Sequence, residues 1–404
     1  MEVELAYGKR SIKLEIPDDV EVDIFAPAVG KTPIGFNEFS DELSKAGADS
    51  LLEGSSVLFI VNDGYRNTPT SQLLEWLDRK DHTILDRAHF LISTGTHSQP
   101  TDHHLRNVFG KFYDRVSARV RSHDCRDISS MRILGKDRFG GEVYLNKAYF
   151  EAKRVCAIGS VEPHYFAGYT GGRKSLIPGL TDFRSVERNH NLANSLEAAP
   201  MKLLGNPVAE HLDEMLGLVD VKKCLSFQIV MDAKRNIAGL FAGDIRSSFQ
   251  RAVECAAEIF GHTVTHRYDT IMCEVLPPLD GNLYQAQKGL ENCQQAVVDG
   301  GTVVVVSACA EGIGSQHFWD LANGWNRTDN RPGDGKLHFG SHKLSRVNEM
   351  RKRITPAIHC ELSPDQVRKV FYEPLNDLES LTNSKKLNYR LAIVHDAGNT
   401  VLRT

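Results

Sequence analysis

The 404-residue sequence has few cysteines, no long apolar run and almost no net charge. Its eight cysteines are scattered without a CxxC pair, which argues against a disulfide scaffold and against closely spaced zinc thiolates. No window is apolar over the length that a membrane helix needs, and the opening MEVEL lacks the segments of a secretory signal. The net charge of −4 supplies no basic field for nucleic acid or anionic lipid. We therefore expect a cytoplasmic protein with no nucleic-acid or membrane partner.

The sequence does contain short runs rich in valine and isoleucine that alternate with helical patterns. This alternation is typical of α/β proteins, and several runs are continuous enough to be covered on both faces of a sheet. A helical pattern over 249–260 ends where a new series of strands begins, so we place a boundary near 262–269 and predict domains 1–265 and 266–404. The predicted strands are 57–61, 90–93, 155–159, 227–231, 271–276, 303–307 and 391–394, after an antiparallel ribbon over 3–16.

Polar segments follow four of these strands directly. Ligands of open α/β sheets gather beyond the carboxyl ends of the strands, so these segments are the candidate site. The first contains Asp63 and Arg66, which could hold an anionic group or cap the following helix. The second ends on His97, whose imidazole titrates near neutrality and suits general acid–base catalysis, although a local cap explains it equally well. The segments are 62–68, 94–100, 160–178 and 277–288.

The third segment is the most informative, because four glycines surround Lys174. Glycine allows positive φ and close approach of a ligand, so such a run indicates a cradle for a phosphate or a planar cofactor. A phosphate-binding P-loop does not fit, since Arg173 stands where the motif requires glycine before the lysine. A zinc site built from three imidazoles is chemically reasonable, but its long spacing is not diagnostic. Those histidines are His97, His164 and His190.

The fourth segment places Gln285 and Lys288 three residues apart in a helical pattern. On a helix they share a face and could together bind a carboxylate, whereas the simpler interpretation is a solvated helix surface.

With these residues, the chain resembles the nickel-pincer-nucleotide-dependent lactate racemase family over nearly its whole length. Five separated motifs carry the resemblance, in the family's order. They are GTH at 95–97, HYFAGYTGGRK at 164–174, PG at 178–179, NH at 189–190, and NLYQ at 282–285 with Lys288.

The resemblance implies two α/β domains with mostly parallel sheets and an active site in the cleft between them. Lys174 would carry the cofactor covalently, a pyridinium mononucleotide whose sulfur-containing carbonyl groups hold nickel, and His190 would be a further nickel ligand. Dedicated cofactor-building enzymes would be partners in maturation. The remaining cofactor contacts would come from Asp63, Arg66, Gly171 and Gly172.

The implied activity is racemisation or 2-epimerisation of a small-molecule 2-hydroxy acid. Hydride would leave C2 for the cofactor and return to the other face, while His97 and His164 act as bases on opposite faces of the substrate. Two bases are needed because the hydroxyl changes position. Gln285 and Lys288 would hold the substrate carboxylate from the second domain.

Departures from the family pattern bear on the substrate. Tyr65 stands where the family's DxTR turn has threonine, and Ser98 follows His97 where arginine is common. If Tyr65 fills the substrate pocket, a short acid is favoured, and if it swings aside, a polyhydroxy or aromatic acid fits. Two other classes remain open: a cofactor- or nickel-binding protein without turnover, and a metal-dependent hydrolase, which would give Lys174 no role.

Overall fold

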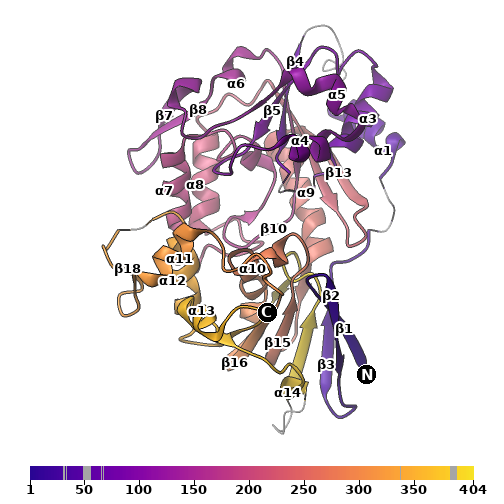
Figure 1. Cartoon of the computed structure of the whole chain (residues 1–404). Helices are drawn as coiled ribbons and strands as arrows, with labels where there is room; N and C mark the ends of the chain where they lie inside the picture. Colours follow the sequence, from indigo (N-terminus) through magenta and orange to yellow (C-terminus); the bar gives the residue numbers. More distant parts are fainter. Residues whose placement is uncertain are drawn as a thin grey trace.

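The computed structural model describes residues 1–30, 32, 34–48, 56–64, 66, 68–336, 338–382 and 389–404. Within these residues, two six-stranded sheets each form the centre of a lobe (Figure 1). The sheet of the first lobe has the order β13 (Ile237–Asp244), β12 (Cys224–Met231), β9 (Val155–Ser160), β4 (Val57–Asn62), β5 (Ala88–Ser93) and β6 (Val120–Ser122). Only β13 in this sheet is antiparallel to its neighbour.

The sheet of the second lobe is parallel throughout. Its order is β20 (Glu373–Pro374), β19 (Thr355–His359), β16 (Val297–Val306), β15 (Tyr268–Glu274), β21 (Arg390–Val394) and β3 (Glu21–Phe25). The shorter strands are β1 (Glu2–Tyr7), β2 (Arg10–Glu15), β7 (Met131–Lys136), β8 (Glu142–Asn146), β10 (Pro163–His164), β11 (Gly168–Tyr169), β14 (Gly261–Thr263), β17 (Trp325–Asn326), β18 (Arg331–Pro332) and β22 (Val401–Arg403).

Helices cover the sheets, and no described helix is both long and apolar enough to cross a membrane. Those of the first lobe are α1 (Phe36–Lys45), α3 (Thr70–Lys80), α4 (Asp102–Phe109), α5 (Tyr113–Val116), α6 (Lys147–Glu151), α7 (Phe183–Asn191), α8 (Pro207–Leu216) and α9 (Ile245–Phe260). Those of the second lobe are α10 (Leu283–Cys293), α11 (Gln316–Asn323), α12 (Ser341–Met350), α13 (Pro364–Lys369) and α14 (Glu379–Thr382).

The predicted α/β class is confirmed, and so is the antiparallel ribbon, in which β1 pairs with β2. Several predicted ends were wrong: the strands predicted from 227 and from 303 begin at Cys224 and Val297. Two further ends have a clear local cause. The strand predicted over 271–276 ends at Glu274, shortly before Pro277, which has no N–H to continue a ladder. The helix predicted over 249–260 begins earlier, at Ile245, because the Asp244 carboxylate caps it by accepting from the N–H groups of Arg246 and Ser247.

The strand pairing crosses the predicted domain boundary at residue 265. Strand β3 lies beside β21 in the second sheet, and β14 pairs with β22 near the C-terminus. The β1–β2 ribbon also packs on the second sheet, where Leu5 and Leu14 share a core with Val304. Figure 1 shows this indigo ribbon beside the strands of the second lobe. The first 25 residues therefore lie with the second lobe, and the division into 1–265 and 266–404 stays a prediction.

Buried polar contacts join the lobes. Arg346 of α12 donates two hydrogen bonds to the Glu291 carboxylate, at 2.8 and 2.7 Å, and two more to the carbonyls of Ala193 and Ser195 in the first lobe, at 3.0 and 2.9 Å. Arg346 is 1% exposed and Glu291 is equally buried. An ion pair so deeply buried is costly to break, because the partner left behind is an uncompensated charge.

We expect Arg346→Met to lower the free energy of unfolding by about 3–5 kcal/mol, because the Glu291 carboxylate then loses its buried partner. Urea unfolding followed by circular dichroism measures the change. The matched control is Arg351→Met at the end of the same helix, whose pair with Glu373 is exposed and should be worth less than about 1 kcal/mol. Equal effects of the two substitutions would contradict this account.

Candidate active site

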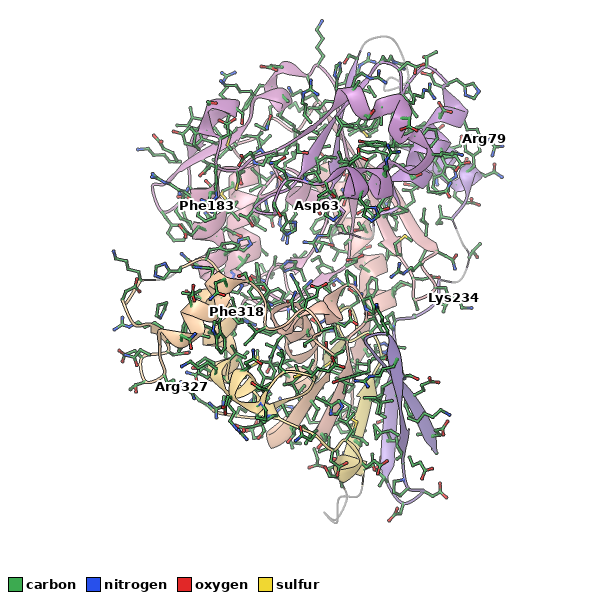
Figure 2. The ribbon with its side chains drawn as sticks, in the orientation of Figure 1. Asp63, Arg79, Phe183, Lys234, Phe318 and Arg327 are labelled. Atoms are coloured by element: carbon green, nitrogen blue, oxygen red, sulfur yellow. The ribbon has the colours of Figure 1, made fainter. Side chains whose placement is uncertain are left out.

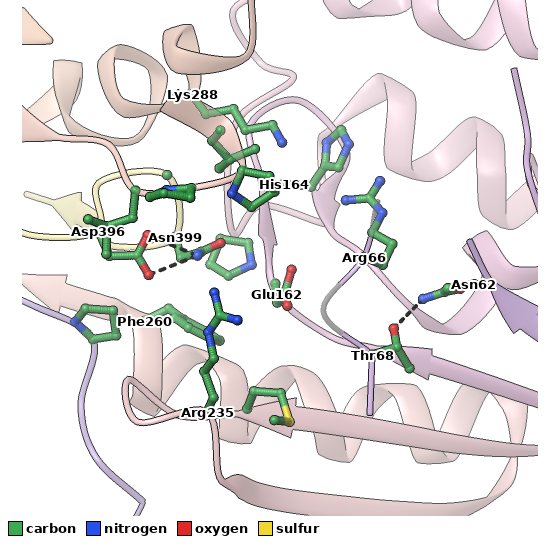
Figure 3. A pocket seen from close by; sticks show the side chains of 18 of the residues that line it. Asn62, Arg66, Thr68, Glu162, His164, Arg235, Phe260, Lys288, Asp396 and Asn399 are labelled. Carbon is green, nitrogen blue, oxygen red and sulfur yellow. Dashed lines mark hydrogen bonds between the residues drawn. The ribbon is translucent and has the colours of Figure 1, made fainter. Parts of the chain in front are cut away.

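The carboxyl ends of both sheets face one cleft between the lobes, with a cavity of about 530 Å³. The first lobe contributes Asp63 and Arg66 after β4 and His164 after β9, and the second contributes Lys288 on α10. Figure 2 shows Asp63 in the first lobe, near its junction with the second, and Figure 3 shows Arg66, His164 and Lys288 around the cavity. Three of the four sequence-predicted segments therefore line one cavity, as the parallel topology predicts. The fourth, 94–100, does not line it, although its His97 lies 2.6 Å from Asp63.

The glycine-rich run forms a β10–β11 hairpin and then a short 3₁₀ helix, Gly172–Ser175. Gly171 and Gly172 have φ of +71° and +53°, which side chains rarely adopt. A Cβ on Gly172 would lie 2.4 Å from the Phe249 ring, and the Gly172 N–H donates to Gln228 Oε1 at 2.7 Å. The two glycines thus pack against β12 and α9 and fix the turn that presents Lys174, while their contact with a cofactor stays a prediction.

Lys174 lies half-buried on this turn. Burial, together with the cations Arg66, Arg173 and Lys288, holds the pKa of its amine well below the usual range. An uncharged amine is a nucleophile, whereas an ammonium ion is not. The surroundings of Lys174 therefore favour the form that can make a covalent bond to a carbonyl group.

His164 and His190 both contact the Phe166 ring, with ring centroids 4.5 and 5.0 Å from it. His190 Nδ1 lies 2.9 Å from the Val186 carbonyl within α7, so Nδ1–H donates and Nε2 keeps its lone pair. Burial and the nearby Lys174 lower the pKa of His190 to about 3. His190 is thus a neutral imidazole with one nitrogen available for a metal.

The two predicted bases have different hydrogen bonds. His97 Nδ1 is 2.6 Å from Asp63 Oδ2, so its Nδ1–H donates to the carboxylate and Nε2 can accept a proton. His164 Nδ1 instead accepts the Ala167 N–H at 3.2 Å, which leaves a hydrogen on Nε2 of the neutral ring. Burial and the nearby Lys174 hold the pKa of His164 well below its usual range.

Of the predicted carboxylate-binding pair, Lys288 lines the cavity and Gln285 does not. Both lie on α10, whose first turn is capped by Asn282 accepting from the Gln285 N–H at 3.0 Å. Burial lowers the pKa of Lys288 to about 7, an effect that the Arg66 charge reinforces and the Glu162 carboxylate opposes. Tyr65, the third predicted substrate contact, lies outside the described residues.

The zinc interpretation of the three histidines is wrong. Among the described residues, no three His, Cys, Asp or Glu side chains form a group that could hold a metal ion. His164 and His190 each pack edge-on against Phe166, and His97 is hydrogen-bonded to Asp63.

Sequence reasoning missed His342 of α12, in the second lobe. Its Nε2 lies 3.0 Å from the Tyr165 hydroxyl, and its ring centroid lies 5.2 Å from that of Phe166 and 6.3 Å from that of His190. Burial and the nearby His190 hold the pKa of His342 well below its usual range. No motif surrounds His342 in the sequence, so only the fold reveals its place beside the site.

Two α/β lobes thus surround a cleft that is lined by His164 and by the cations Arg66 and Lys288, which is the arrangement of an enzyme that binds a small molecule between its lobes. A protein-family model described as "Lactate racemase N-terminal domain" matches residues 7–200, and a second described as "Lactate racemase C-terminal domain" matches residues 270–330. The chain belongs to the lactate racemase family and is an isomerase.

The relatives agree with this assignment. The lactate racemase of Thermoanaerobacterium thermosaccharolyticum is 27% identical over 99% of both chains, and that of Lactiplantibacillus plantarum is 28% identical over 78% of this chain and 77% of its own. The solved apoprotein from T. thermosaccharolyticum covers 100% of both chains with a TM-score of 0.83 and 23% identity. A protein from Thermotoga maritima matches 93% of this chain and 100% of its own, with a TM-score of 0.73 and 15% identity. The structural matches establish the same fold.

Proposed function

We propose that the protein is a racemase or 2-epimerase of a 2-hydroxy acid, with a nickel-pincer nucleotide bound covalently to Lys174. The observation that carries the proposal is the placement of Lys174, whose pKa burial and nearby cations hold well below the usual range, near His190, whose Nδ1–H donates to Val186 and leaves Nε2 available. These are the two groups that such a cofactor needs, a nucleophile for its carbonyl and a nitrogen ligand for nickel. Asp63 and Arg66, at the end of β4, would complete the contacts with it.

The cofactor, when bound, supplies the hydride acceptor for C2 of the substrate. The protein's own groups bind and orient the acid and move its proton. Arg66 and Lys288 approach the cavity from opposite lobes and would hold the carboxylate between them. Closing the lobes on a bound acid would then complete the site and exclude water.

The two histidines would handle the C2 oxygen on the two faces. His97 Nε2, held by Asp63 through Nδ1, accepts the hydroxyl proton when the oxygen lies on its side. His164 presents Nε2–H as a hydrogen-bond donor to the C2 oxygen on the other side. Because a neutral imidazole that lost this proton would become an anion, transfer of the proton would first require a second proton on Nδ1 and release of the Ala167 N–H.

Lactate is the first substrate to test, since the relatives are named for it. The protein should be co-expressed with enzymes that build the cofactor and then incubated with single enantiomers of lactate and of larger 2-hydroxy acids. Chiral chromatography would detect the opposite enantiomer or epimer. No inversion of any acid by protein shown to contain cofactor and nickel would contradict the proposal.

The pH dependence should follow Lys288. Its ammonium is charged below pH 7 and loses its proton above, so kcat/KM for a carboxylate substrate should fall with rising pH through about 7, by up to about tenfold per pH unit. Lys288→Arg should remove this fall because a guanidinium stays charged. Glu162→Gln should move the fall to lower pH, since it removes the anion that raises the Lys288 pKa. An unchanged alkaline fall in Lys288→Arg would rule Lys288 out.

A further inference from the structure

The cavity is larger than a three-carbon acid requires. Its volume of about 530 Å³ lies in the range of roughly 300–1,000 Å³ that encloses drug-sized ligands, while lactate has the bulk of only a few water molecules, about 30 Å³ each. Neither Lys174 nor His190 lines this cavity. Asp63 and Arg66, the other proposed cofactor contacts, do line it, so the cofactor would take the space beside them. Figure 3 shows Arg235, Asp396 and Asn399 on the side of the cavity away from Arg66, where space for substrate remains.

Polar side chains from three loops line this space and form what we name the distal wall: Glu162, Arg235, Asp396 and Asn399. Glu162 follows β9, Asp396 follows β21, and Arg235 lies in the turn between β12 and β13. Figure 3 shows the Arg235 side chain directed toward Asp396, Asn399 and Glu162. The wall thus combines residues of both lobes at the mouth of the cleft.

The local backbone fixes the wall. Arg235 has a φ of +60°, and its turn is held by Asp232 Oδ1, which accepts from the N–H groups of Lys234 and Asn236, both at 2.9 Å. Asp396 has a φ of +45°, and its carboxylate accepts from Asn399 Nδ2 at 3.1 and 3.0 Å. Arg235 and Asp396 thus both have left-handed backbone conformations, and hydrogen-bonded loops direct their side chains into the same cavity.

Two of these charged groups interact with opposite charges only at longer range, Glu162 with Arg66 and Lys288, and Arg235 with Asp396. Within the described part of the chain, the Glu162 carboxylate and the Arg235 guanidinium make no hydrogen bond and no ion pair, although Glu162 is half-buried. Burial raises the pKa of Asp396 to about 6, an effect that the Glu162 charge reinforces. A donor-rich ligand at this wall would relieve both carboxylates.

We infer that the distal wall binds the hydroxyl groups of a polyhydroxylated 2-hydroxy acid, so that the substrate is a 2-hydroxy acid with a chain of several hydroxylated carbons. This inference rests on the proposed function. A hydroxyl both donates and accepts, which matches two carboxylates beside a guanidinium and an amide. A second carboxylate or a phosphate would meet more negative than positive charge, and an alkyl tail would leave the Glu162 carboxylate and the Arg235 guanidinium without a hydrogen bond.

The test uses cofactor-loaded protein and three matched acids: D-gluconate, enantiopure 2-hydroxyhexanoate of the same length without further hydroxyls, and malate with a second carboxylate. We expect kcat/KM for gluconate to exceed that for each of the others by about tenfold or more. Asparagine tolerates the left-handed backbone at both positions. Arg235→Asn and Asp396→Asn should therefore each lower kcat/KM for gluconate by about tenfold and leave lactate turnover unchanged. Lys234→Asn, in the same turn, is the control. Saturation-transfer NMR measures binding independently of turnover.

The outcomes separate the two proposals. Inversion of lactate with no preference for gluconate, or with no effect of Arg235→Asn and Asp396→Asn on gluconate, would overturn the distal-wall inference and leave the racemase proposal standing. A preference for malate or 2-hydroxyhexanoate would overturn it as well. Gluconate binding that depends on Arg235 and Asp396, without inversion of any acid by loaded protein, would support the subsite and contradict the proposed function.

Discussion

Lys174→Ala is expected to yield protein without covalent cofactor and to reduce racemisation to the background rate. The reason is local: the turn set by Gly171 and Gly172 presents an amine whose pKa burial and three cations hold well below the usual range. Alanine removes the nucleophile, and without a covalent bond the His190 imidazole alone is a single metal ligand. Intact-protein mass and nickel content measure the loss, after co-expression with the cofactor-building enzymes.

Lys222→Ala is the matched control, because Lys222 is exposed on the first lobe. It should keep both the mass adduct and the nickel. A mass adduct that persists in Lys174→Ala would show that the cofactor is attached elsewhere. Protein that is folded, free of adduct and still active would contradict a tethered cofactor altogether.

We expect His164→Gln to lower kcat by about 10²–10⁴-fold while the cofactor stays bound, the usual effect of removing one positioned acid–base group. Glutamine can donate a hydrogen bond at the position of Nε2, but it cannot take up a proton. Since His97 remains beside Asp63, each enantiomer should be affected differently, and the half-reaction on one face should survive. Steady-state rates for both enantiomers and single-turnover measurements would show this asymmetry.

His103→Gln on α4 serves as the control, because this substitution also replaces an imidazole ring by an amide, and His103 is exposed. Its rates should match those of the wild type. A rate of His164→Gln within about threefold of the wild type would remove His164 from the proton transfers.

Much of the fold was predictable because it depends on local patterns. Runs such as Val57–Val61 and Val303–Val306 are apolar on both faces, which is what a central parallel strand requires. Some of the errors arose where local chemistry decides an end, as at Pro277 and Asp244. The pairing of β3 with β21 was not predictable, since strands 365 or more residues apart give no sign in the sequence of which neighbour each will take.

The candidate site divides in the same way. The topology rule brought Asp63, Arg66, His164 and Lys288 to one cavity, because each follows or lies close to the carboxyl end of a parallel strand. By contrast, His342 lies on a helix with no motif, and its bond with Tyr165 depends on how the lobes pack. Arg235 and Asp396 were not predicted as site residues, because each lies in an ordinary turn and only the folded chain brings them to the same cavity.

Inversion of an enantiopure 2-hydroxy acid by loaded protein in D₂O, followed by chiral chromatography and proton NMR, tests the central claim most directly. Hydride that leaves C2 and returns to the other face carries the original hydrogen with it, so the account predicts the opposite enantiomer or epimer with protium kept at C2. Deuterium at C2 of the product would contradict hydride transfer and indicate removal of C2–H as a proton. The absence of any inversion by protein that contains cofactor and nickel would contradict the racemase assignment itself.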